Sequence, residues 1–281
     1  MRLTGLIAFL ILKSYCGYSQ NQSTTKSIHR KGKLYFSWGW NREWFSKSDI
    51  HFKGPEYDFT IKKVVAKDRP SEFEVDTYFN PNHLSTPQFS FKVGYFFKNN
   101  FSIAFGTDHM KYVVEPEQVV KISGNISGTE TIYDGTYSDN DITLKDDFLQ
   151  FEHTNGLNYI NVDLRRFDEI FSFHKISVNL TEGLESGILL PRTDATLLNN
   201  ENYDEFHLAG YGVNVVAGVN ISFLKSFFVQ TEAKGGYINM PDIRTTPSAA
   251  DMASQNFFFT QFNFVFGATI DLHKKKKETD K

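Results

Sequence analysis

The residues that could carry out a reaction begin with a histidine in the segment 151–156. His153 is a candidate general base, and Thr154 beside it carries a hydroxyl group that a base could activate. Adjacent side chains of an extended strand point to opposite faces, so these two cannot meet. His153 and Asn155 are two residues apart and are expected to share a face, without a hydroxyl. The segment therefore predicts a polar strand end, and a hydrolase that uses His153 remains an alternative.

A second set of reactive side chains is a group of charges that alternate with apolar residues along several segments. Three are basic and three are acidic: Lys92, Arg165, Lys234, Asp163, Glu185 and Glu232. Leaving one buried charge unpaired costs about 3–5 kcal/mol, so equal numbers of the two signs predict mutual pairing. We expect a polar, packed interior charge network rather than an ion or proton pathway.

The sequence gives little support for a metal site or a cofactor. The eight histidines include neither His-x-His nor His-Glu-x-x-His. The run 139–141 resembles the start of a calcium loop, but the glycine and the distant glutamate of that loop are missing. We expect no metal site and no cofactor, with calcium binding by this acidic region as an alternative. A net charge of −3 gives no indication of a nucleic-acid partner.

The elements that must position these residues are β-strands, because apolar and polar residues alternate with a period of two. The clearest strand is 256–273, whose length suits a tilted membrane strand. Its outward face is predicted to contact lipid through Phe258, Phe262, Phe264, Phe266, Ile270 and Leu272.

Eight such segments occur along the chain. They are 34–41, 89–97, 101–106, 157–166, 176–187, 210–223, 227–239 and 256–273. The connections between them alternate long and short, which is typical of barrels with short periplasmic turns, longer outer loops and periplasmic termini. This pattern predicts an all-β fold, an eight-stranded antiparallel transmembrane β-barrel with long extracellular loops. A ten-stranded barrel remains open.

The chain divides into four expected parts. Residues 1–19 are a predicted signal peptide, with Arg2, an apolar core at 3–12 and small residues before the cut. Cys16, the only cysteine, would be removed with it, which excludes disulfides and thiolate sites from the mature chain. A periplasmic lead-in at 20–32, a barrel at 33–273 and a charged periplasmic tail at 274–281 follow.

These features resemble small Gram-negative outer-membrane β-barrels of the OmpA-transmembrane, OmpX and opacity-protein kind. The run 267–272 resembles the Gly-x-x-apolar-x-apolar ending that the outer-membrane assembly machinery recognises. The chain departs from the family where it lacks a terminal aromatic residue and continues into 274–281. It also departs from barrel phospholipases and lipid A deacylases, whose nucleophile lies in a His-x-Ser-Asn pattern.

The expected function follows from the two longest connections, 42–87 and 113–150, which exceed what closing a hairpin needs. Binding residues are often found on loops that a rigid scaffold positions. We expect a monomer in the bacterial outer membrane with a structural or surface-interaction role. Its expected partners are outer-membrane lipids, the assembly machinery and an extracellular ligand at these loops. A lipid A or phospholipid deacylase using His153, or a small solute channel, remains an alternative.

Overall fold

The computed structural model describes residues 29–80, 87–200 and 203–272. The expected signal peptide, most of the lead-in and the charged tail lie outside the described residues. Those described form one antiparallel sheet of 14 strands and one short helix, α2 (Val75–Phe79). None of their helices is long and apolar enough to cross a membrane.

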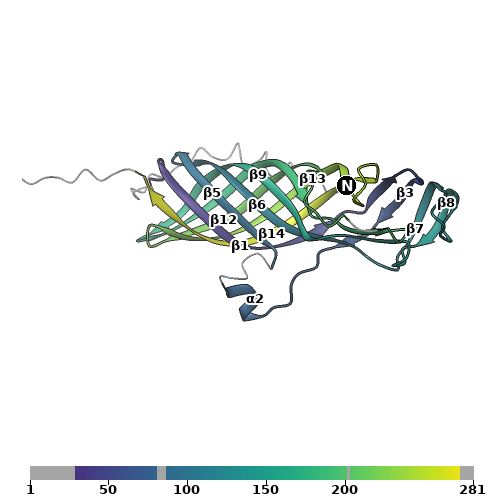
Figure 1. The fold of residues 1–281 in the computed structure, drawn as a ribbon. Coiled ribbons are helices and arrows are strands. Elements are labelled where there is room, and N and C mark those ends of the chain that lie inside the picture. The colour runs from purple at the N-terminus through teal and green to yellow at the C-terminus, as the bar shows by residue number, and fades with distance from the viewer. Residues whose placement is uncertain (1–28, 81–86, 201–202, 273–281) are drawn as a thin grey trace, which may run out of the picture.

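Eight strands close into a barrel (Figure 1). They are β1 (Lys33–Phe45), β5 (Phe89–Lys98), β6 (Phe101–Val114), β9 (Leu149–Phe173), β10 (Ile176–Pro191), β12 (Gly210–Phe223), β13 (Phe227–Arg244) and β14 (Met252–Asp271). The last strand returns to the first in a register that runs from Lys33–Asp271 to Phe45–Phe259. The predicted eight-stranded antiparallel barrel is confirmed, and the ring closes with eight strands rather than ten.

Three tight turns join strands at one end of the barrel, after residues 98, 173 and 223. The strand predicted at 157–166 is longer than expected, because β9 continues to Phe173. A bulge in β9 opposite Val178 and Asn179 interrupts the alternation there, so that Ile170 and Phe171 are both exposed. Two adjacent outward apolar residues hide a strand from a period-two pattern.

The outside of the barrel is apolar and the inside is polar. All six predicted lipid-facing residues of 256–273 are exposed, the last just after the end of β14. On the neighbouring strand, Trp38 packs edge-on against Phe266 with ring centroids 5.5 Å apart. An apolar exterior around a closed antiparallel barrel is the architecture of bacterial outer-membrane proteins.

The connections expected as irregular loops contain further strands. These are β2 (Ser48–Lys53), β3 (Tyr57–Val64), β4 (Ala66–Lys67), β7 (Val119–Ile126), β8 (Gly135–Thr143) and β11 (Asp194–Leu197). β2 pairs with the start of β14, and β3, β7 and β8 follow it in order. β4 pairs with β6 and β11 with β9. These six strands, here called the outer extension, prolong the barrel wall beyond one end (Figure 1).

One apolar core joins the outer extension to the barrel. Phe52 stacks on Phe59 within the extension, with ring centroids 5.3 Å apart, and meets Phe151 of β9 at 5.7 Å. The same buried cluster continues through Met110 and Tyr159 of the barrel strands. The mouth of the barrel next to the extension is therefore filled by apolar side chains, and the extension is anchored to the barrel strands.

Candidate functional site

The six charges predicted to face the lumen all lie inside it. They come from β5, β9, β10 and β13, on positions that alternate with the outward apolar residues, and each is at most 4% exposed. The structure brings them into one network.

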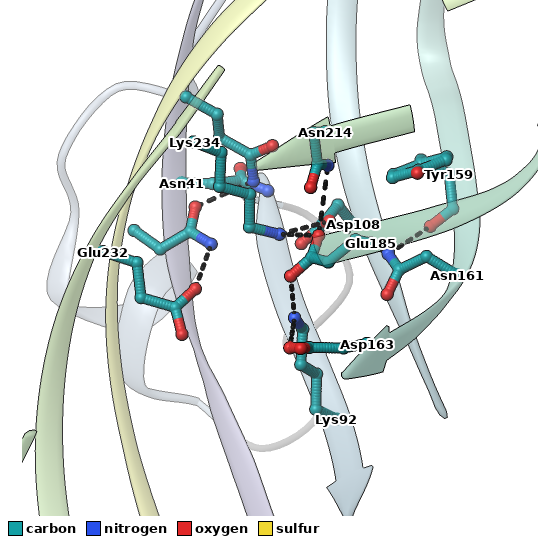
Figure 2. A network of polar contacts seen from close by, with 12 residues as sticks. Asn41, Lys92, Asp108, Tyr159, Asn161, Asp163, Glu185, Asn214, Glu232 and Lys234 are labelled. Atoms are coloured by element: carbon teal, nitrogen blue, oxygen red, sulfur yellow. Dashed lines mark hydrogen bonds and ion pairs between the residues drawn. The ribbon is translucent and has the colours of Figure 1, made fainter. Parts of the chain in front are cut away.

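Two lysines bridge the carboxylates of the network (Figure 2). Lys92 Nζ donates to Asp163 Oδ2 at 2.6 Å and also contacts Glu185. Lys234 Nζ lies 2.9 Å from Glu185 Oε2. Glu185 therefore joins both lysines, and each ammonium group has two carboxylate partners, because Lys234 also pairs with Asp108 at 2.7 Å.

Arg165 links the remaining members of the network. Its Nη2 donates to Asp163 Oδ2 at 2.6 Å and to Glu185 Oε1 at 3.2 Å, while Nη1 pairs with Glu232. Because the guanidinium group has five donors in a fixed plane, it can hold several carboxylates at once. The arrangement fixes the side chains of β9, β10 and β13 relative to one another.

Asp108 is the member that the sequence analysis missed. The predicted strand ended at residue 106, whereas β6 continues to Val114 and places Asp108 inward. The signal was present, since Ala104, Gly106 and Asp108 occupy alternate positions. With Asp108 the carboxylates outnumber the cations, and amide groups supply further donors. Asn161, Asn214 and Asn263 donate to Asp108, Glu185 and Glu232 respectively, each at 3.1 Å.

Apolar side chains also close the barrel at the end with the tight turns. Arg30 crosses this mouth, donates to Asn179 Oδ1 at 2.6 Å and lies over the rings of Phe96 and Phe167. Tyr35 packs against the same cluster. The cavity beside the charge network has a volume of about 30 Å³, room for about one water molecule. The charged layer therefore lies between the apolar core at one end of the lumen and a packed layer of Arg30 and aromatic side chains at the other.

His153 lies at the end of the barrel that adjoins the extension, where the outward residues of β9 are polar rather than apolar. Its side chain is fully buried between Tyr112 and Phe151, and its Nδ1 is 3.0 Å from the hydroxyl of Thr193. Burial lowers the pKa of His153 to about 3, so the ring is neutral near pH 7. Thr193 is also buried. His153 and Thr193 together provide a base and a hydroxyl group, but both side chains are buried and a lipid cannot reach them in this structure.

The expectation that His153 and Asn155 share a face is wrong. Asn155 is exposed, and its Nδ2 donates to Asp204 Oδ1 at 3.3 Å. The pairing of β6 with β9 shifts register here, and Gly156 has a φ of +122°, a conformation that side chains rarely adopt. This bulge turns Asn155 outward.

The acidic region considered for calcium is paired with lysines. Asp139 Oδ1 lies 3.0 Å from Lys62 Nζ, and Asp141 Oδ1 lies 2.9 Å from Lys121 Nζ. Within residues 29–80, 87–200 and 203–272, no group of three or more His, Cys, Asp or Glu side chains is arranged to hold a metal ion.

No protein-family model and no curated protein matches the chain. Among solved structures, the outer membrane protein OprG from Pseudomonas aeruginosa is 9% identical, with 88% of this chain and 99% of OprG covered and a TM-score of 0.42. The outer membrane protein AlkL is 10% identical, with 92% and 100% covered and a TM-score of 0.40. Ail, the attachment invasion locus protein of Yersinia pestis, is 10% identical, with 85% and 99% covered and a TM-score of 0.33.

These similarities concern the fold alone and carry no conclusion about activity. The resemblance to small outer-membrane barrels is confirmed at the level of fold, where the strand pairing and the apolar exterior already establish it.

Proposed function

We propose that this protein is a surface protein of the outer membrane, in which a closed barrel holds the outer extension outside the cell for contact with a partner. The observation that carries the proposal is the apolar core shared by the extension and the barrel. A connection that only closed a hairpin would need two to five residues and no core of its own. The extension is instead a folded, rigidly attached structure that presents a fixed surface.

The strand connections support an orientation with periplasmic termini. The described residues next to both termini lie at the same end as the three tight turns, since Lys33 pairs with Asp271. Outer-membrane barrels have short periplasmic turns and longer outer loops. The tip between β7 and β8, where Ile132 is 87% exposed, would then point away from the cell.

The geometry does not favour the two alternatives. A channel would need an open path, whereas apolar core residues fill one end of the lumen and Arg30 with the aromatic rings around it fills the other. A lipid hydrolase using His153 would need the base and its hydroxyl partner at a surface, whereas His153 and Thr193 are buried. The lumen network has the arrangement of a structural support, because each cation is paired with two or more carboxylates.

Photocrosslinking in intact cells tests the proposal. A photoreactive amino acid replaces Ile132 at the tip of the outer extension, and the control carries it at Lys225 in the tight turn after β12. We expect crosslinked products with an outside partner from position 132 and none with that partner from position 225. A variant in which a short turn replaces residues 119–143 should lose the same product while the barrel still folds. The proposed role would be contradicted if position 132 gave no crosslinked product and if the replacement of residues 119–143 left the cell surface phenotype unchanged.

A further inference from the structure

Four cations meet at the mouth of the barrel that carries the tight turns. They are Arg30, Lys33, Lys175 and Lys225. The first two lie at the start of β1, and the others lie in the turns after β9 and β12. The strands β10, β12, β13, β14 and β1 follow one another in the ring, so these segments adjoin along one side of the mouth. All four side chains line one cavity of about 30 Å³, which we call the basic cavity.

The described residues do not balance the positive charge of the basic cavity. No carboxylate lines the cavity, and none of its three lysines forms an ion pair within residues 29–80, 87–200 and 203–272. Asp271 is opposite Lys33 in the pairing of β1 with β14, but the two side chains form no ion pair. Glu169 lies within electrostatic reach of Arg30. If these two carboxylates each offset one cation, an excess of two positive charges remains, which attracts an anion.

Arg30 forms a fixed floor of the basic cavity, and the exposed Lys175 and Lys225 form its rim. The Arg30 side chain is 7% exposed and lies over the rings of Phe96 and Phe167. Among the described residues its guanidinium group, which has five donors, donates only to Asn179. Because Arg30 also lines the cavity beside the charge network, it lies between the two cavities. An anion that enters from the mouth therefore meets a donor whose position is already fixed.

One wall of the basic cavity is apolar and continues onto the outside of the barrel. Phe227 lines the cavity, and its side chain is 51% exposed on the outward face of β13. It stacks with Phe223 across the turn, with ring centroids 6.2 Å apart, and Leu224 in that turn is also exposed. The basic cavity therefore opens next to the apolar exterior, where lipid chains surround an outer-membrane barrel.

We propose that the basic cavity binds the phosphate group of an anionic phospholipid, whose acyl chains lie along Phe227 and the outer wall of β13. A lysine ammonium group is a compact charge on a flexible stem and is a common phosphate ligand. Clusters of cations beside a membrane surface attract anionic lipids in this way. The inference goes beyond the proposed contact at the outer extension and rests on the barrel alone. The proposed orientation decides only which leaflet supplies the lipid.

The size of the basic cavity favours a lipid over a soluble anion. A volume of about 30 Å³ holds about one water molecule, so only part of one phosphate group can enter. The remainder of the ligand lies outside, and exposed lysines alone contribute little to binding. A phospholipid adds apolar contact between its chains and the outward wall, which free phosphate cannot make.

Lipid binding by the full-length barrel in detergent tests the proposal. Phosphatidylglycerol is titrated into the protein, and native mass spectrometry measures the fraction of protein that carries a single lipid. The comparison ligand is diacylglycerol with the same chains, and inorganic phosphate is added as a competitor. We expect saturable binding of phosphatidylglycerol that weakens with added salt, and binding of diacylglycerol that is about tenfold weaker. Inorganic phosphate at the concentration of the lipid should not compete.

Matched variants of the protein locate the binding. The double variant Lys175→Gln and Lys225→Gln removes two cations of the basic cavity and should weaken phosphatidylglycerol binding about tenfold. The control double variant Lys31→Gln and Lys98→Gln removes the same charge at the same end of the barrel, outside the cavity, and should bind as the unchanged protein does. All four lysines are exposed, so both variants should fold, and a barrel band that shifts on heating in gel electrophoresis confirms it.

Four results would overturn the inference. Equal binding of diacylglycerol would leave only apolar contact, and competition by an equal concentration of inorganic phosphate would make the cavity a site for free phosphate. Unchanged binding by the Lys175/Lys225 variant, or equal weakening by the control variant, would place the lipid elsewhere. Failed lipid binding together with a crosslinked partner at position 132 would leave the proposed function intact. A specifically bound lipid without a crosslinked partner would contradict the proposed function and retain the basic cavity.

Discussion

Lys234 Nζ and Asp108 Oδ2 are 2.7 Å apart, although their strands lie on opposite sides of the barrel. In the ring order, β6 and β13 are four steps apart in either direction, the greatest separation that eight strands allow. This ion pair therefore crosses the full width of the lumen. It can form because an eight-stranded barrel has an interior that side chains just fill.

The variant Lys234→Met tests the structural role of this crossing. It leaves Asp108 and Glu185 without their shared cation inside the lumen, which should lower the free energy of unfolding by about 3–5 kcal/mol. Urea unfolding in lipid vesicles measures the difference. The control is Lys62→Met, which removes an exposed pair with Asp139 and should leave stability nearly unchanged. Equal stability of the two variants would show that the lumen network contributes little.

The charge network illustrates what alternation can and cannot predict. Six inward charges could be assigned because each lies in a segment with an uninterrupted period of two. Asp108 was missed because its outward neighbours Thr107 and His109 are polar, so the apolar half of the alternation ends before them although the inward positions continue. Outward residues turn polar where a strand leaves the lipid, so apolar alternation marks the membrane band and not the end of the strand.

The closed lumen predicts the absence of conductance. Purified protein in a planar bilayer should give no discrete current steps, because the apolar core closes one end of the charged layer and Arg30 with the aromatic rings around it closes the other. The variant Arg30→Ala should also remain closed, since it opens one mouth and leaves the charge network and the outer core in place. An open porin in the same bilayer is the positive control. Steps from the unchanged protein would show that the lumen opens.

The outer extension shows the main limit of prediction from the sequence. Within the first long connection, β3 and β4 occupy residues 57–64 and 66–67. The other strands of the extension are short, and glycine and polar residues interrupt the alternation of β7 and β8. Their pairing depends on contacts with residues distant in the sequence, such as Phe52 with Phe151. Local patterns cannot show such contacts, so a folded extension resembled irregular loops.

Buried His153 predicts a specific dependence of stability on pH. Its folded pKa of about 3 is below the value of about 6.5 for an exposed histidine, so the unfolded chain binds the extra proton between these values. Stability contributed by the neutral ring is therefore present above about pH 6.5 and is lost as the pH falls. As the pH falls from 6.5 to 5, the free energy of unfolding of the unchanged protein should decrease relative to that of His153→Gln by up to about 1.4 kcal/mol per pH unit.

Urea unfolding of His153→Gln and of the unchanged protein at several pH values measures this difference. If the His153→Gln variant followed the unchanged protein across this range, the ring would be hydrated or charged in the folded state. That outcome would reopen the question of whether His153 is accessible.

Single cysteines test the proposed orientation. Cys16 lies in the predicted signal peptide, so an introduced cysteine is expected to be the only thiol of the mature chain. In intact cells, a membrane-impermeant maleimide should label Ile132→Cys at the tip of the outer extension. Lys175→Cys, in the tight turn after β9, should react only after the cells are broken. Labelling in the reverse order would place the outer extension in the periplasm.

The final prediction concerns closure of the barrel, where β14 pairs with β1. Phe266 is opposite Trp38 and Ile270 is opposite Leu34, all on the outward face. Replacing Phe266, Ile270 and Leu272 with lysine should block assembly, because each lipid-facing charge costs roughly 2–4 kcal/mol near the midplane and less toward the interface. The control Ser254→Lys lies on the same strand and face, opposite His51 in the outer extension, and should assemble. A normal heat-modifiable band from the triple variant would show that this face does not contact lipid.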